Sequence, residues 1–401
     1  MKYQINKIIL LGVCFPLLVS CSFSSSQRNS DISLGNYESV TFKINLKNAP
    51  SPLNTENYTV DSILPMNTSD DIGTFEATKV FVNNDKIYIL DSDVTKTILV
   101  FNFSGQFLYK LGEIGRAKNE YINAPEDFFV AKNGEVHVFD KGGQKILVFS
   151  DDGFFLRNID IRWAHSFGVT SNGRYVCCLD NQDIPDEESD PSLLIYDSNT
   201  GRKIPLIPSK HFQCYFRPNS CTFFSNDDRL SHVPLLSDSV IVFKNDIVEK
   251  VVRFDFVNGF LPKDKPEWVR FPNDDSEPLG ARVNYDVFPG AIAIYDYQES
   301  ESHVLMNYID KSGFVHWLYN KRTKKLVHGN KLFTGLNIFN KFFLKGNQII
   351  VFVGKEDVEM LKEYCESEEF DKEEYKKTPS FVKAFQSGKL SAPALVYITI
   401  K

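Results

Sequence analysis

Most signatures of catalysis and of nucleic-acid binding are missing from this 401-residue sequence. It contains neither a phosphate-binding G-x-x-x-x-G-K-[ST] loop nor a G-x-S-x-G nucleophile motif. Its cysteines and histidines show none of the spacings typical of zinc sites. Positive charge is also in deficit, because 45 lysines and arginines face 52 aspartates and glutamates, for a formal net charge of −7. We therefore expect no cofactor and no bound metal. Nucleic acid and anionic membrane surfaces are excluded as partners, since both favour an excess of cations.

A long apolar run is missing as well. The apolar segment from Ile8 to Val19 is too short to cross a bilayer as a helix, which takes about 20 such residues. Lys2 and Lys7 precede it, and a basic start followed by a short apolar core is typical of a secretory signal. The segment ends in Leu-Val-Ser-Cys, which resembles a bacterial lipobox and implies cleavage before Cys21 and lipidation of that residue. The alternative is an ordinary signal peptide with a chance cysteine.

The cysteines that remain beyond this point, the lipidated one aside, are odd in number, so at least one is unpaired. Cys177 and Cys178 are adjacent in a strand-like run, so they point to opposite faces and do not suit a bond to each other. Cys214 and Cys221 are close enough in sequence to bridge a loop. For all five, Cys365 included, we favour buried free thiols.

Strand signals dominate the rest of the chain. Phenylalanine (34) and tyrosine (17) are abundant, and the aromatic and β-branched runs are short and bounded by Asn, Asp, Gly and Ser, as is typical of strands. Two segments, 83–111 and 131–159, repeat one another: Asn84 falls on Asn133 and, after a one-residue gap, Ile98 falls on Ile146. Each unit reads as four strands joined by Asx and Gly turns, which is the antiparallel meander of a β-propeller blade.

Weaker copies of this unit fill 36–401, and at roughly 40–50 residues per blade the segment holds about six blades. The sequence therefore predicts an all-β fold, a six-bladed β-propeller of four-stranded antiparallel blades. A lipoprotein signal peptide (1–20) and a flexible tether (21–35) precede it, and helical spacing of apolar residues predicts a short helical insertion at 355–367, in the last blade. Two separate β domains are the alternative, which the aligned repeats and the lack of a polar linker disfavour.

The two ends of the propeller segment both read as strands. Val40 to Leu46 stands at its start and Leu395 to Ile400 at its end. Propellers commonly close by pairing a strand from one terminus with the blade built from the other. We expect these two segments to close the ring.

Asp91 and Asp140 occupy the same position in the two clearest repeats, at the end of the second strand. One interpretation is a functional pair of carboxylates at one rim. The other is a short acid that caps a turn by accepting bonds from backbone amides. We favour the second, because an active site is rarely repeated in every blade.

The connections from one blade to the next are the segments on which we place a ligand site. Each crosses one rim, at a mouth of the central channel, and two of them combine aromatic and charged residues on rigidly held loops, as in many binding sites. The candidate residues are Arg116, Lys118, Glu120, Tyr121, Arg162, Trp163 and His165. For Glu120 and Tyr121 the favoured alternative is that they only anchor the crossing. No catalytic residue and no metal ligand are assigned.

The first crossing also carries a family resemblance. Gly112 to Tyr121, followed by Asp127-Phe128, resembles the pattern I-G-x-x-G-x-G-P-G-E-Y…D-F. That pattern marks six-bladed β-propeller lipoproteins of Bacteroidetes, whose blades resemble NHL repeats. The sequence departs from it at 117–119, where Ala-Lys-Asn replaces Gly-Pro-Gly. The resemblance implies an outer-membrane lipoprotein, and the lack of acidic residues directly after Cys21 favours the periplasmic side over the cell surface.

Two functions remain open from the sequence. The favoured one is a lipid-anchored, non-catalytic binding or scaffold module for a glycan, a peptide or an envelope protein, with the lipid as its only membrane contact. The alternative is a propeller enzyme, a lyase or hydrolase acting on a glycan or small metabolite at the channel mouth. Histidines and carboxylates converging in the channel would favour the enzyme, whereas a channel lined by phenylalanine and aliphatic side chains would argue against it.

Overall fold

The structure is a computed structural model of the chain. It describes residues 36–45, 53, 57–67, 72–83, 85–161, 164–179, 191–208, 222–226, 228–234, 237–257, 259–260, 269–270, 282–283, 290–310, 312–330, 332–333, 341–366 and 380–401.

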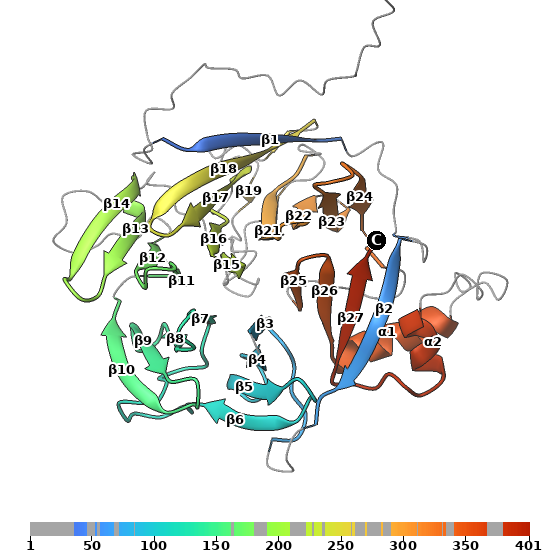
Figure 1. Cartoon of the computed structure of the whole chain (residues 1–401), viewed down its shortest axis with the longest axis horizontal. Helices are drawn as coiled ribbons and strands as arrows, with labels where there is room; N and C mark the ends of the chain where they lie inside the picture. The colour runs from blue at the N-terminus through green and yellow to red at the C-terminus, as the bar shows by residue number, and fades with distance from the viewer. Residues whose placement is uncertain are drawn as a thin grey trace, which may run out of the picture.

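Six antiparallel sheets form a ring of blades around a central axis, as predicted (Figure 1). Each of the first three blades follows chain order from the inside outwards. Blade one is β3 (Lys79–Asn83), β4 (Lys86–Asp91), β5 (Thr97–Asn102) and β6 (Phe107–Leu111); blade two is β7 (Asp127–Val130), β8 (Val136–Asp140), β9 (Lys145–Phe149) and β10 (Phe155–Asp160); blade three is β11 (Ser166–Val169), β12 (Tyr175–Cys178), β13 (Pro191–Asp197) and β14 (Arg202–Pro208).

The other three blades include two strands from the start of the chain. Blade four is β15 (Phe223–Asn226), β16 (Arg229–His232), β17 (Ser239–Lys244) and β18 (Ile247–Phe256), with β1 (Glu38–Ile44) outermost; blade five is β21 (Ala293–Glu299), β22 (His303–Asp310), β23 (Gly313–Asn320) and β24 (Leu326–Gly329); blade six is β25 (Phe342–Lys345), β26 (Gln348–Val353) and β27 (Ala394–Ile400), with β2 (Tyr58–Pro65) outermost. A separate two-stranded ladder pairs β19 (Val269–Arg270) with β20 (Arg282–Val283).

The middle strands are buried on both faces, which explains their nearly continuous apolar sequence. In β4, for example, Tyr88 and Leu90 point to one side and pack with Phe128 of blade two, whereas Ile87 and Ile89 point to the other side and belong to the cluster shared with blade six. Each blade thus separates two hydrophobic clusters, and a blade without its neighbours would expose both of its apolar faces to solvent.

Ring closure was predicted correctly in kind but with the wrong strand. β2, not the segment from Val40, pairs antiparallel with β27 and completes blade six. β1 pairs instead in parallel with β18 and adds a fifth strand to blade four (Figure 1). The reason lies in the aromatic core: Phe42 of β1 packs edge-on against Trp317 and stacks on Phe254, between blades four and five.

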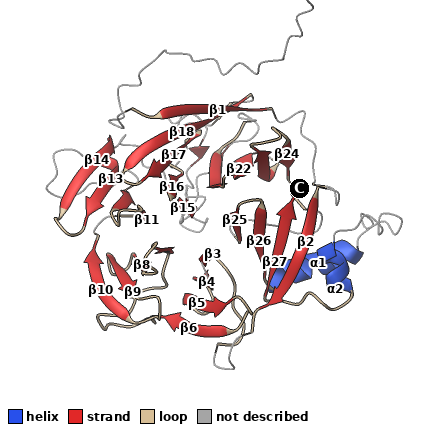
Figure 2. Ribbon diagram, viewed as in Figure 1, coloured by secondary structure: helices blue, strands red, loops and turns tan. Residues whose placement is uncertain are grey.

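The helical insertion was predicted correctly, and its second helix was missed. α1 (Lys355–Glu366) and α2 (Ser380–Gln386) lie between β26 and β27, beside blade six (Figure 2). Asp357, in the first turn of α1, accepts a hydrogen bond from the amide of Gly354, the residue before the helix, at 2.8 Å, as in the second half of a capping box. The seven residues of α2 are too few to show a helical period. Neither described helix is long and apolar enough to span a membrane.

The ring has two faces, which are named here because the site depends on them. The crossing face holds the connections between blades and the turns between the second and third strands of each blade. The turn face holds the turns between the first and second strands and between the third and fourth. On the turn face, neighbouring blades contact each other: Lys86 pairs with Asp151 at 2.8 Å, and Thr170 donates to Asp246 at 2.7 Å.

Candidate functional site at the turn-face mouth of the channel

The first crossing, on the crossing face, is a self-anchored loop. Tyr121 is fully buried, and its hydroxyl donates to the Leu111 carbonyl. The Glu120 carboxylate accepts a bond from the Ala117 amide at 2.7 Å, and Gly115 leaves room for that carboxylate, since a Cβ there would lie 1.9 Å from it. Glu120 and Tyr121 therefore hold the shape of the loop.

The structure describes three of the other candidate residues of the crossing face. Arg116 and Lys118 are exposed on the same loop. His165 stands on the next crossing and is buried, with its backbone amide bonded to the Cys178 carbonyl at 2.8 Å. Arg162 and Trp163 lie outside the described residues. Of the predicted residues that the structure describes, Arg116 and Lys118 are therefore the two that are exposed to solvent.

The repeated aspartates cap turns, as the favoured interpretation stated. Asp91 is fully buried and accepts bonds from three amides of the turn that follows it, at 2.9–3.1 Å. Asp140 accepts from the Gly143 amide at 2.9 Å and from the Ile122 amide at 3.1 Å, so it also ties the crossing to its blade.

Several histidines are buried inside blades rather than gathered in the channel. Burial lowers the pKa of His137 and of His316 to about 4, so both are neutral near pH 7. His137 bonds the Tyr175 hydroxyl at 2.9 Å, and His316 bonds Asn307 at 2.7 Å. In the described part of the chain, no group of three or more His, Cys, Asp or Glu residues is placed to hold a metal ion.

The cysteines that the structure describes are free thiols. Cys177 and Cys178 are buried, Cys365 is half-buried, and burial raises the pKa of Cys177 to about 12. Cys214 and Cys221 lie outside the described residues. The prediction of free thiols is confirmed for the first three, although Cys365 is less buried than expected.

A buried ion pair joins the first residues of two inner strands, near the crossing face. The Lys79 ammonium lies 2.7 Å from Asp127, and the two side chains are 11% and 1% exposed. It also donates to the Phe128 carbonyl at 3.0 Å and lies 4.2 Å above the Phe129 ring. These contacts join the inner strands of blades one and two.

Aromatic side chains fill the next layer of the channel. Phe81 and Phe343 meet edge to face, with ring centroids 5.1 Å apart. They line a small cavity of about 20 Å³ together with Phe224 and Phe342, from blades four and six. This layer separates the ion pair from the turn face.

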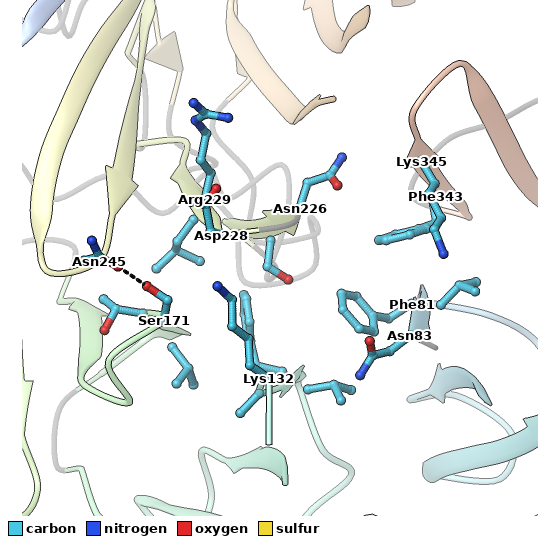
Figure 3. A pocket seen from close by; sticks show the side chains of 18 residues that line it. Phe81, Asn83, Lys132, Ser171, Asn226, Asp228, Arg229, Asn245, Phe343 and Lys345 are labelled. Atoms are coloured by element: carbon cyan, nitrogen blue, oxygen red, sulfur yellow. Dashed lines mark hydrogen bonds between the residues drawn. The ribbon is translucent and has the colours of Figure 1, made fainter. Parts of the chain in front are cut away.

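Beyond the aromatic layer the channel widens into a cavity of about 310 Å³ on the turn face, which we call the mouth (Figure 3). Blades one, two, three, four and six all contribute to its lining. The lining consists of the last residues of the inner strands and the turns that follow them. Its labelled polar members are Asn83, Lys132, Ser171, Asn226, Asp228, Arg229, Asn245 and Lys345.

Two of the three cations in the lining are not neutralised by neighbours. Arg229 is paired with Glu249 at 2.6 Å, in a two-pronged contact. Lys132 and Lys345, by contrast, are exposed, and within the described ranges neither is paired with a carboxylate. They come from blades two and six and lie on different sides of the mouth in Figure 3. The lining also holds a described carboxylate, Asp228, which is paired with Lys244 at 3.5 Å, so Lys132 and Lys345 give the mouth a net positive charge on a chain whose net charge is negative.

Side-chain amides complete the lining. Asn226 donates to the Leu344 carbonyl at 2.8 Å, which fixes its position between blades four and six. The Asn245 carbonyl oxygen accepts from the Ser171 hydroxyl at 2.6 Å. Amides held in this way offer the donors and acceptors that suit hydroxyl or amide groups of a ligand.

The candidate residues predicted from the sequence lie on the crossing face, whereas this cavity opens on the turn face. The signal was present in the repeats: the first turn of successive units carries polar residues at Asn83, Lys132 and Ser171. The repeat assigns these positions to the Asx and Gly turns of each unit and gives them no role in binding. In a propeller both faces have a channel mouth, and nothing in one sequence tells which of them is open.

The chain matches a known protein family over most of its length. Residues 41–389 match the family described as Domain of unknown function (DUF4934). No curated protein matches the chain.

Solved structures resemble the chain in fold. An exported protein of Bacteroides fragilis has 18% sequence identity and a TM-score of 0.68, over 90% of this chain and 99% of that one. A member of the DUF4221 family from Bacteroides vulgatus has 10% identity and a TM-score of 0.46, over 86% and 98%. Virginiamycin B lyase of Staphylococcus aureus has 10% identity and a TM-score of 0.37, over 73% and 95%.

Proposed function

The chain belongs to the DUF4934 family, and from the geometry of its mouth we propose that it is a non-catalytic binding module of the bacterial cell envelope. The observation that carries the proposal is the mouth itself. Five blades contribute to one cavity of about 310 Å³, a size at the lower end of small-ligand sites. Inner strands of a closed ring hold its side chains, so the site is preorganised and loses little entropy on binding.

The layer behind the mouth supports binding rather than catalysis. Phe81 and Phe343 form its floor, and the charged residues of the small cavity beneath them, Lys79 and Asp296, are buried and held by Asp127 and Asn307. The buried, neutral His137 is hydrogen-bonded to Tyr175 of blade three, and the buried, neutral His316 is hydrogen-bonded to Asn307 of its own blade. A propeller enzyme of the lyase or hydrolase type needs titratable groups within reach of its substrate.

The envelope location rests on the N-terminal sequence. The signal segment and the lipobox-like end at Cys21 support export and lipid anchoring, and the lack of acids just after Cys21 supports the periplasmic side of the outer membrane. Mass spectrometry of the protein isolated from membranes tests this: a diacylglyceryl-modified N-terminal Cys21 is expected, and an N-terminus elsewhere would contradict it.

A ligand screen on the purified chain carrying Cys21→Ser tests the binding site. We expect a glycan or peptide of the screen to raise the melting temperature of this chain, and to lose that effect when Lys132 and Lys345 are both changed to alanine. Lys389→Ala, at an exposed lysine beside α2, is the control and should bind normally. Binding that survives in the double variant but is lost in an Arg116→Ala/Lys118→Ala variant would move the site to the crossing face and overturn the proposal.

A further inference from the structure

We infer that the ligand of the mouth is an acidic saccharide, a short chain of uronic-acid type whose carboxylates lie between Lys132 and Lys345. The inference rests on the proposed function, because it names the chemical class bound at that same site. Three features of the lining carry it: the charge, the aromatic floor and the amides.

The positive charge of the lining favours an anionic ligand. Lys132 and Lys345 face one cavity from two blades, and neither is paired with a carboxylate in the described part of the chain. Asp228, a carboxylate of the same lining, is paired with Lys244 at 3.5 Å. Like charges that share a partly enclosed cavity repel each other, and an anion between them relieves that repulsion. Since the chain as a whole repels anions, attraction in the mouth comes from these local groups. Arg229, already held by Glu249, contributes less.

The floor suits the apolar face of a sugar ring. Phe81 is half-buried, and Phe343 is only 6% exposed and held edge-on against it, so both rings are rigid. A partly exposed aromatic ring, here that of Phe81, below a ring of polar groups is a common form of a site for an amphipathic ligand. A free inorganic anion has no apolar surface that could pack against this aromatic floor.

The amides suit hydroxyl groups. Asn83, Asn226 and Asn245 ring the mouth from two blades, and each amide is both a donor and an acceptor, as a sugar hydroxyl is. Phosphate esters commonly bind at helix N-termini, and both described helices lie in the crossing-face insertion between β26 and β27, away from the mouth. Peptides in turn commonly pair with an open strand edge, whereas the mouth is lined by turns.

An array of oligosaccharides tests the inference, with galacturonate, glucuronate and mannuronate trimers each set beside its own methyl ester. The esters keep the ring and the size and remove only the charge. We expect at least one acid to bind the Cys21→Ser chain about tenfold or more tightly than its ester. Its binding should weaken severalfold between 50 and 500 mM NaCl, as screening requires.

Charge-reversal variants locate the contact. Lys132→Glu/Lys345→Glu should abolish binding of the acid, whereas Lys389→Glu/Lys362→Glu, with the same change of net charge at exposed lysines of the insertion that holds α1 and α2, should leave it within twofold. Equal binding of acid and ester, lost on Phe343→Ala, would overturn the inference and leave the proposed function standing. Binding of no uronate would also overturn the inference, and the wider screen would then decide the proposed function by itself.

Discussion

Tyr58 lies opposite Ile400 in the register of β2 and β27, so the two ends of the propeller segment are paired in one sheet. Farther along the same ladder, Thr399 donates to Asp61, 338 residues away, at 2.7 Å. The Tyr58 ring packs edge-on against Phe333, at 5.0 Å between centroids. Blade six is therefore complete only when β2, from the N-terminal part of the chain, has paired with β27 at the C-terminal part.

Removing β2 is expected to unfold far more of the protein than removing β1. A chain beginning at residue 66 lacks the strand that completes blade six, leaving β27 as an open edge, and should lose the single cooperative transition. A chain beginning at 46 loses only the fifth strand of blade four, with Phe42, and should lose about 1–3 kcal/mol of unfolding free energy. Thermal unfolding followed by circular dichroism distinguishes the two. Equal melting temperatures for both truncations would contradict the assigned closure.

The sequence was sufficient to predict the blades, but not to predict which strands pair when they lie far apart in the chain. Blade count and turn positions follow from the repeat, because each strand pairs with its sequence neighbour. Of the two N-terminal strands, only β1 was predicted from the sequence, and the partners of β1 and β2, which are β18 and β27, lie far away in sequence. Which of these strands pairs with β27 and which with β18 depends on side-chain packing, such as that of Phe42 against Trp317. The mouth was missed for a similar reason, since Lys132 and Lys345 meet only once the ring is closed.

Gly112→Ala is expected to destabilise the protein more than Gly173→Ala. Both glycines have positive φ, +68° and +79°, so both substitutions incur about 1–2 kcal/mol of backbone strain. A Cβ at Gly112 would also lie 2.8 Å from the buried Tyr121 ring, whereas a Cβ at Gly173 would meet nothing within 4 Å. We expect a further loss of about 1–3 kcal/mol for Gly112→Ala alone. Matching unfolding free energies in urea would show that the crossing does not depend on the position of Tyr121.

Lys79→Met is expected to cost about 3–5 kcal/mol of unfolding free energy, because it leaves Asp127 buried without its cation. Adding Asp127→Asn to that variant should recover part of the loss, since the uncompensated charge is then removed. Lys110→Met is the matched control: its pair with Glu113 is 51% and 62% exposed, and its loss should cost well under 1 kcal/mol. Denaturant unfolding of all three variants checks this. Similar losses for Lys79→Met and Lys110→Met would show that the pair at the crossing end does not hold blades one and two together.

Stability is expected to fall below pH 6.5, in part through His137. Burial lowers the pKa of His137 in the folded protein to about 4, against about 6.5 in the unfolded chain, and nearby Glu135 only partly offsets this. As the pH falls from 6.5 towards 4, the unfolded chain takes up a proton that the folded protein does not. The contribution is therefore complete above pH 6.5 and is lost progressively below it.

His137→Gln removes this titration, so the variant should lose less stability than the wild type between pH 7.5 and 4.5, by about 2–3 kcal/mol. Urea unfolding at both pH values measures the difference. Glutamine retains a polar group near the Tyr175 hydroxyl, 2.9 Å from the histidine ring, so any constant cost of the substitution cancels between the two conditions. A pH dependence equal to that of the wild type would show that His137 is protonated in the folded protein and that its pKa is not lowered by burial.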